Sequence, residues 1–193
     1  MKTIETTLIT TAIFSDDNTK RYLLKKVWDE KKPSLAIILL APSDASGIAL
    51  DNTTQLTINN TDRLGYGSLS IVNLFATLDD FSLMNAEDED KENMKVILAE
   101  AKKCDTLVYA PGVGKAKNQA FQLRSEQVLS QLKPYEKKMK CISNEDGSIR
   151  LRHPLTPSVR TWYLNDVTIA EAMQVITEAA QPPKPVGRPK KSE

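Results

Sequence analysis

The side chains best suited to do chemistry stand directly after apolar runs of the chain. Carboxylates follow the first run at Asp44 and Asp51, an amide lies near the end of the second at Asn73, and the single histidine, His153, follows the last. A carboxylate can position a water molecule, and an imidazole can stabilise an anion. An amide offers a donor and an acceptor side by side, as the edge of a nucleobase requires. These residues are therefore the first candidates for a catalytic or ligand-binding site.

Each candidate also has a purely structural interpretation. Asp44 is equally suited to a helix cap or a turn, and Asn73 to tying two loops together by hydrogen bonds. A lone histidine before a proline is commonly a packed loop residue. Arg150 and Arg152 would keep His153 near positive charge, which favours binding of an anion. Both interpretations stay open on the sequence alone.

The apolar pattern predicts strands that alternate with helices. Predominantly apolar runs, typical of strands covered on both faces, occupy residues 35–41, 69–76, 106–110 and 139–143, and a Thr-rich edge strand is expected over 6–14. Helical spacing and capping predict helices over 19–30, 87–103, 115–132 and from the Thr168–Glu171 capping box onward. This order predicts an α/β fold of three layers, α/β/α, with a mainly parallel sheet of four to five strands.

Ligands of an open parallel sheet bind at the carboxyl ends of its strands, where the chain turns and helix N-termini converge. That rule selects the segments 42–47, 51–54, 73–75, 111–115 and 150–155. It adds further candidate ligand-binding residues, namely Pro42, Ser43, Gly112, Lys115 and Arg152.

Several kinds of site are excluded by the residues that are missing. A phosphate-binding Walker loop around Gly114-Lys115 would need glycine where Tyr109 stands and Ser or Thr where Ala116 stands. One histidine and two separated cysteines do not make a zinc site, so neither a metal nor a cofactor is expected. A serine-hydrolase Gly-x-Ser-x-Gly elbow is absent from the sequence.

Charge is balanced over the 193 residues, with 26 Lys and Arg against 25 Asp and Glu, but it is uneven along the chain. Residues 1–180 are expected to form one globular domain, and residues 181–193 a disordered, Pro-rich basic tail. The tail motif Gly187-Arg188-Pro189 resembles an AT-hook, which would bind the minor groove of DNA through Arg188, Lys190 and Lys191. A general solubility role is the alternative. With no signal peptide or membrane-length apolar run visible, a cytoplasmic location is expected.

Six ordered motifs resemble the bacterial and phage family called domain of unknown function 1643. They are Trp28-Asp29, Ala41-Pro42-Ser43-Asp44, Asp51-Asn52-Thr53, Arg63-Leu64-Gly65-Tyr66-Gly67, Asn73-Leu74-Phe75 and His153-Pro154-Leu155. The resemblance covers roughly residues 20–160 and adds Arg63 and Tyr66 to the candidate ligand-binding residues. The chain departs from the family's usual Asn-Pro-Ser-Thr loop at Ala41 and Asp44, and from its usual tryptophan at Pro111.

The motif order is in turn similar to that of the uracil-DNA glycosylase superfamily, which implies a uracil-DNA-glycosylase-like fold. In that superfamily a loop after the first strand positions water, and an asparagine ending the second strand reads the base. A Trp-Gly turn follows the third strand, and a His-Pro loop contacts the flipped nucleotide. By position, these roles fall on residues 42–44, Asn73, residues 111–112 and His153-Pro154.

The leading hypothesis is a pocket that binds a nucleobase, a nucleotide or DNA, with glycosylase-like hydrolysis as its chemistry. Asp44 or Asp51 would then position water, and His153 would stabilise the leaving base. One alternative is a non-catalytic DNA-binding accessory protein that uses the basic tail. Another is a hydrolase or transferase acting on small molecules unrelated to nucleic acids. The expected partner is a nucleotide or DNA, and no membrane is expected.

Overall fold

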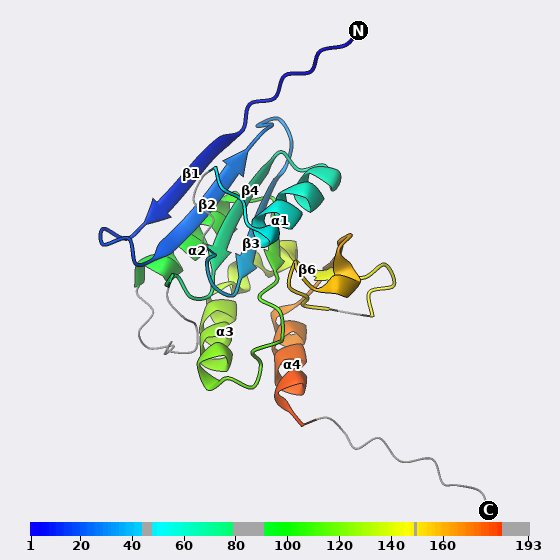
Figure 1. Cartoon of the computed structure of the whole chain (residues 1–193). Helices are drawn as coiled ribbons and strands as arrows, with labels where there is room; N and C mark the ends of the chain where they lie inside the picture. Colours follow the sequence, from blue (N-terminus) through cyan, green and yellow to red (C-terminus); the bar gives the residue numbers. More distant parts are fainter. Residues whose placement is uncertain (44–47, 79–90, 149, 183–193) are drawn as a thin grey trace, which may run out of the picture.

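The computed structural model describes residues 1–43, 48–78, 91–148 and 150–182 (Figure 1). Within them, seven strands form one sheet in the order β1-β2-β4-β3-β5-β6-β7. The strands are β1 (Ile9–Phe14), β2 (Arg21–Val27), β3 (Ser34–Leu39), β4 (Ser68–Asn73), β5 (Thr106–Tyr109), β6 (Met139–Ser143) and β7 (Tyr163–Asp166). The central four, β4-β3-β5-β6, are parallel, whereas β1, β2 and β7 pair antiparallel. The sheet is therefore mixed and larger than the mainly parallel sheet of four to five strands that the sequence predicts.

Helices cover both faces of this sheet, which confirms the α/β class (Figure 1). They are α1 (Asn52–Arg63), α2 (Lys91–Lys103), α3 (Gln119–Gln131) and α4 (Ile169–Ala180), with short 3-10 helices η3 (Lys133–Lys138) and η4 (Pro157–Val159). Because side chains alternate along a strand, Ile37 of β3 packs on the α1 side and Ile38 on the side of α2, α3 and α4. Each face thus has its own apolar core, and the central strands are buried from both sides.

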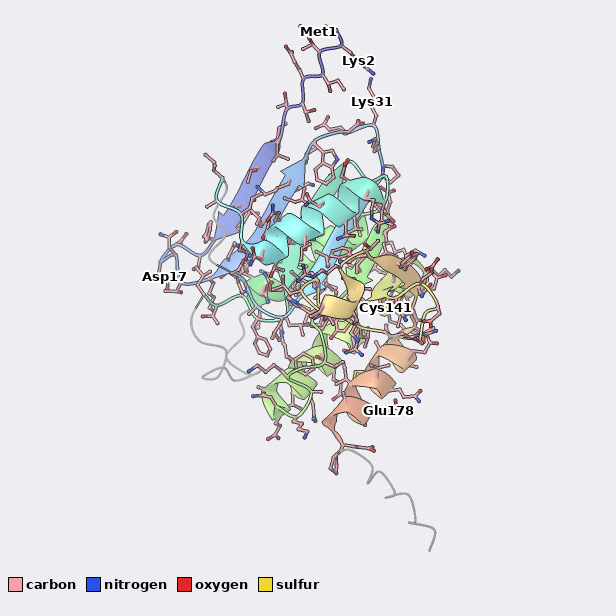
Figure 2. The ribbon with its side chains drawn as sticks, turned by 45° about the vertical axis from the view of Figure 1, so that its right-hand side comes forward. Met1, Lys2, Asp17, Lys31, Cys141 and Glu178 are labelled. Atoms are coloured by element: carbon pink, nitrogen blue, oxygen red, sulfur yellow. The ribbon has the colours of Figure 1, made fainter. Side chains whose placement is uncertain are left out.

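The prediction of a helix over residues 19–30 is wrong, because this segment is strand β2, paired with β1 and β4. Asp16, Asp17 and Asn18, which the sequence offers as caps of that helix, lie in the turn of the β1–β2 hairpin. There Asp17 accepts hydrogen bonds from Ser15 Oγ and the Thr19 main-chain N–H. Figure 2 shows Asp17 at the tip of this hairpin. Leu23 and Leu24 face opposite cores, as neighbouring residues of a strand do. Both are apolar because this strand is buried on both faces.

Two elements were missed because their sequences are polar. Helix α1 buries Thr54, Thr57, Asn60 and Thr61 where an amphipathic helix usually buries aliphatic side chains. Strand β7 is short and partly exposed. By contrast, the predicted capping box is confirmed, because Thr168 and Glu171 bond reciprocally at the start of α4.

The other predicted elements differ at their boundaries. Helix α3 begins after its N-cap Asn118, four residues later than the sequence predicts. The predicted start of the helix over 87–103 lies outside the described residues, and the helix is described from Lys91. The edge strand predicted over 6–14 is confirmed as β1, shorter by three residues at its start.

Candidate functional site

Asn73 ends strand β4 with its side chain closed off from solvent, at 1% exposure. Alternation along the strand places it on the same face as Leu69 and Ile71, the face that α1 covers. Neither Nδ2 nor Oδ1 of Asn73 has a hydrogen-bond partner among the described residues. Asn60 of α1 is a useful contrast, since its amide donates to two carbonyls and accepts from the Trp162 main-chain N–H. A buried amide with unmet hydrogen bonds is costly, so Asn73 calls for an explanation that Asn60 does not.

The main chain around Asn73 is held firmly even though its side chain is not. Nδ2 of Asn93 donates to the carbonyl oxygens of Asn73 and Leu74, at 3.2 and 3.1 Å. Nε of the buried Arg124 donates to the same Leu74 oxygen at 2.8 Å. These contacts come from α2 and α3, on the other face of the sheet, and fix the end of β4. Asn93 and Arg124 are not predicted from the sequence, because both lie within helices whose partners cannot be inferred from spacing.

Asp51 lies on the same face, as the N-cap of α1. One carboxylate oxygen accepts a hydrogen bond from the Thr54 main-chain N–H at 2.6 Å. Burial raises the pKa of Asp51, but hydrogen bonds from Ser43 and Thr54 and the nearby charge of Arg21 outweigh it, so the pKa lies below its usual value. Asp51 is therefore ionised at neutral pH. It caps α1 and also places a negative charge at the candidate site.

Arg21 enters the same region because strand β2 bulges at its first residues. The register against β1 shifts between Ile13 and Phe14, so that Phe14 pairs with Arg21 and Tyr22 is the extra residue. Such a bulge re-aims the side chain beside it. The guanidinium of Arg21 is 2% exposed and donates from Nη1 to the Ser43 carbonyl at 3.0 Å. Burial lowers its pKa, and the negative charge of Asp51 opposes that shift. Arg21 is not predicted from the sequence as a site residue, because the pattern of residues 19–30 predicts a helix there and not a strand.

His153 lies against the turn that follows β5. Gly112 has φ +75°, and a Cβ built on it would lie 2.9 Å from Cβ of His153, so glycine permits this close approach. Nδ1 of His153 accepts a hydrogen bond from the Leu155 main-chain N–H at 3.2 Å. In the neutral ring the proton is therefore on Nε2. Burial lowers the pKa of His153, although Asp51 acts in the opposite direction, so the neutral form prevails at pH 7.

The segment leading to His153 is strained. Leu151 is buried at φ +52°, a conformation that is rare for a bulky residue. Its neighbour Arg152 donates from the main chain to the Ile142 carbonyl of β6 at 3.3 Å. Arg150 is directed elsewhere and pairs with Glu171 of α4 at 3.2 Å. Strain of this kind persists where surrounding contacts determine the backbone, and it is common at functional sites.

The candidate residues fall into two groups by position. Ser43, Asp51, Asn73, Gly112, Arg152 and His153 lie at the carboxyl-end side of the central strands, together with half-buried Pro42 and exposed Lys115. Arg63 is at the far end of α1, roughly 18 Å along the helix from Asp51, where it donates to the Trp162 carbonyl. The hydroxyl of Tyr66 bonds to Thr106, the first residue of β5, at the amino end of the strands. Neither contributes to the arrangement around Asn73.

Asp44 and the tail residues Arg188, Lys190 and Lys191 lie outside the described residues. Among the residues that are described, no group of three or more His, Cys, Asp or Glu side chains is placed to hold a metal ion. Nor does any helix in the same ranges have the length and apolar character to cross a membrane.

Residues 21–155 match the family model described as "Protein of unknown function (DUF1643)". The chain belongs to this family. The family expected from the six motifs is thus confirmed. The DUF1643 match begins at Arg21 and ends two residues after His153, so it contains both, together with Asp51, Asn73 and Gly112. A comparison with curated proteins gave no match.

Proposed function

We propose that this DUF1643 protein binds a nucleobase, in a nucleoside, a nucleotide or DNA, at the carboxyl ends of β3, β4 and β5. The observation that carries the proposal is the buried amide of Asn73, for which the described residues supply no hydrogen-bond partner at either polar atom. Its donor and acceptor are complementary to the paired acceptor and donor on the edge of a base. A ligand that bonds to both atoms supplies hydrogen bonds that the described residues do not make.

His153 supports the same interpretation from the facing loop. Its Nδ1 accepts the Leu155 N–H, so Nε2–H is the donor of the neutral ring. A neutral donor suits a carbonyl oxygen of the base and strengthens its hydrogen bond as negative charge develops there. The lowered pKa of His153 keeps this donor in the neutral form at physiological pH.

Hydrolysis of a glycosidic bond is the reaction that this arrangement would support. The bond between C1′ of the sugar and the base nitrogen breaks, and the electron pair leaves with the base. A water oxygen bonds to C1′, and one proton of that water ends on the base nitrogen. His153 would stabilise the departing anion, and ionised Asp51 would stabilise positive charge on the sugar. The likeness in motif order to the uracil-DNA glycosylase superfamily favours this reaction over other hydrolyses. Taking a base out of a duplex costs a few kcal/mol, so damaged or single-stranded sites would be preferred.

The test is binding of uracil, uridine, uridine monophosphate and a uracil-containing oligonucleotide, followed by NMR or calorimetry at low salt. Wild type is expected to bind at least one, and Asn73→Leu to lose that binding. Absence of binding to all four, with adenine and cytosine counterparts equally inert, would refute the proposal. Release of free uracil from the oligonucleotide, lost in His153→Gln, would establish the hydrolytic step.

The basic tail favours a second function, DNA binding without catalysis. Its evidence is the charge and the Gly187-Arg188-Pro189 motif. Deleting residues 181–193 is then expected to remove oligonucleotide binding and to reduce its salt dependence by about three to four phosphate contacts. Binding of free uridine would be unaffected by the deletion, which separates the tail from the site around Asn73.

A further inference from the structure

Strand β1 forms the outer edge of the sheet, with β2 as its neighbour on the inner side. Its six residues, Ile9–Phe14, contain no charge and no proline. Natural edge strands usually carry such features, because an unprotected edge pairs with other chains. In Figure 2 the chain preceding β1 extends away from the sheet toward Met1 and Lys2, and no other described strand pairs with this edge. An edge of this composition is suited to pairing with another strand.

The two faces of β1 differ in what covers them. Ala12 packs against the core on the α1 side, so Thr10 and Ala12 face that side. Ile9, Thr11 and Ile13 face the opposite way and are exposed, Ile9 at 53% and Ile13 at 42%. On that side α2 packs against β2, β3 and β4 rather than against β1. The two isoleucines are therefore apolar side chains that the described part of the chain leaves uncovered.

We propose that a second copy of this chain pairs with this edge, β1 antiparallel to β1, about a two-fold axis that passes through Thr11. Such an axis is perpendicular to the sheet and keeps each residue on its own face, so paired residues must belong to the same face. With the axis at Thr11, Ile9 of each copy lies opposite Ile13 of the other, and Thr11 lies opposite Thr11. On the second face, Thr10 lies opposite Ala12.

This register is favoured because it places the two exposed isoleucines of the strand opposite each other. Continuing it outward places Leu8, which is 48% exposed, opposite Phe14. Shifting the pairing by two residues in either direction places Ile9 opposite Thr11 or Ser15 and loses the apolar pairs. Cross-strand pairs of β-branched residues, and Thr–Thr pairs, each stabilise a sheet modestly. The interface is small, so the self-association depends on protein concentration.

Sedimentation velocity of the full chain over a range of concentrations tests the proposal. Wild type is expected to shift from monomer to dimer, and Ile13→Lys to remain monomeric because its ammonium would face Ile9 of the other copy. Leu123→Lys on α3 is the matched control, since Leu123 has the same 42% exposure and lies away from β1. Unchanged far-UV circular dichroism shows that each variant is folded. A monomer at every wild-type concentration, or an Ile13→Lys protein that dimerises like wild type, would overturn the proposal.

The register has its own test in cysteine crosslinking. Thr11→Cys places two thiols opposite each other and is expected to give a dimer with a short bis-maleimide. Thr7→Cys is the control, because its two copies would lie roughly 27 Å apart at 3.4 Å per residue. The native Cys104 and Cys141 are buried and do not compete. Crosslinking of Thr7→Cys in preference to Thr11→Cys would refute the two-fold axis at Thr11.

Discussion

Replacing Asn73 by leucine is expected to stabilise the protein while abolishing its ligand binding. Leucine has the same number and connectivity of side-chain heavy atoms as asparagine but no polar group. The Asn73 amide is buried, and neither of its polar atoms has a partner in the part of the chain that the structure describes. Leaving a buried polar group unsatisfied costs about 1–3 kcal/mol. Removing that penalty raises the free energy of unfolding by a similar amount. For a chain of this size, each kcal/mol corresponds to about 2–4 °C in Tm.

Urea and thermal unfolding of the full chain measure the effect directly. Asn60→Leu is the control, because Asn60 is equally buried in α1 but its amide is fully engaged with Leu56, Arg160 and Trp162. That substitution leaves partners unpaired and is expected to lower the free energy of unfolding by about 1–3 kcal/mol. The two leucine variants should thus change stability in opposite directions.

A loss of stability in Asn73→Leu equal to that of Asn60→Leu would refute the reasoning. It would mean that the Asn73 amide holds the fold together and is not reserved for a ligand. Asn73→Asp provides a second check, because it preserves the shape but places a carboxylate where nothing described pairs with it. It should destabilise the protein more than any neutral substitution at the same position.

Three further substitutions follow from the same contacts. Burial lowers the pKa of His153, so the unfolded chain binds more protons than the folded chain near pH 6. The free energy of unfolding should therefore fall as the pH drops below about 6.5. In urea titrations, His153→Gln should lack that loss. Asp51→Ala removes the N-cap of α1 and should lower the free energy of unfolding by about 1 kcal/mol at pH 7. Because folding lowers the pKa of Asp51, the stability that its charge provides in wild type should be lost as the pH falls through that pKa. Gly112→Ala combines a positive φ with a 2.9 Å contact to His153 and should cost about 1–3 kcal/mol, whereas Gly114→Ala, with nothing within 4 Å, should leave thermal unfolding unchanged.

The central part of the fold could be predicted because it depends on patterns that neighbouring residues share. Four apolar runs became the parallel strands β3, β4, β5 and β6, and the rule that ligands bind at their carboxyl ends selected Asp51, Asn73, Gly112 and His153. Of these, Gly112 and His153 are in direct contact although 41 residues separate them along the chain. Strand order alone was enough to bring such distant loops to one edge.

The β1–β2 hairpin could not be predicted by the same method. Leu23, Leu24 and Val27 occur at spacings compatible with a helix, and periodicity over so few residues does not separate a two-sided strand from a helix. Pairing with β4, which follows about forty residues later, decides the conformation. The wrong prediction for this segment also affected the candidate site, because a bulge in strand β2 positions Arg21 there.

Buried polar residues were the second source of error. They explain why only some residues of the candidate site could be predicted from the sequence. Helix α1 was missed because its inner face is made of threonines and an asparagine that bond back to the helix or across to residues 160–162. Asn93 and Arg124 likewise donate hydrogen bonds to the carbonyl oxygen of Leu74. Asn60, Asn93 and Arg124 bond to partners far away in sequence, which spacing along the chain does not reveal. The same comparison sets Asn73 apart. Asn60 and Asn93 each have a hydrogen-bonded side-chain amide, whereas neither polar atom of Asn73 has a partner among the described residues.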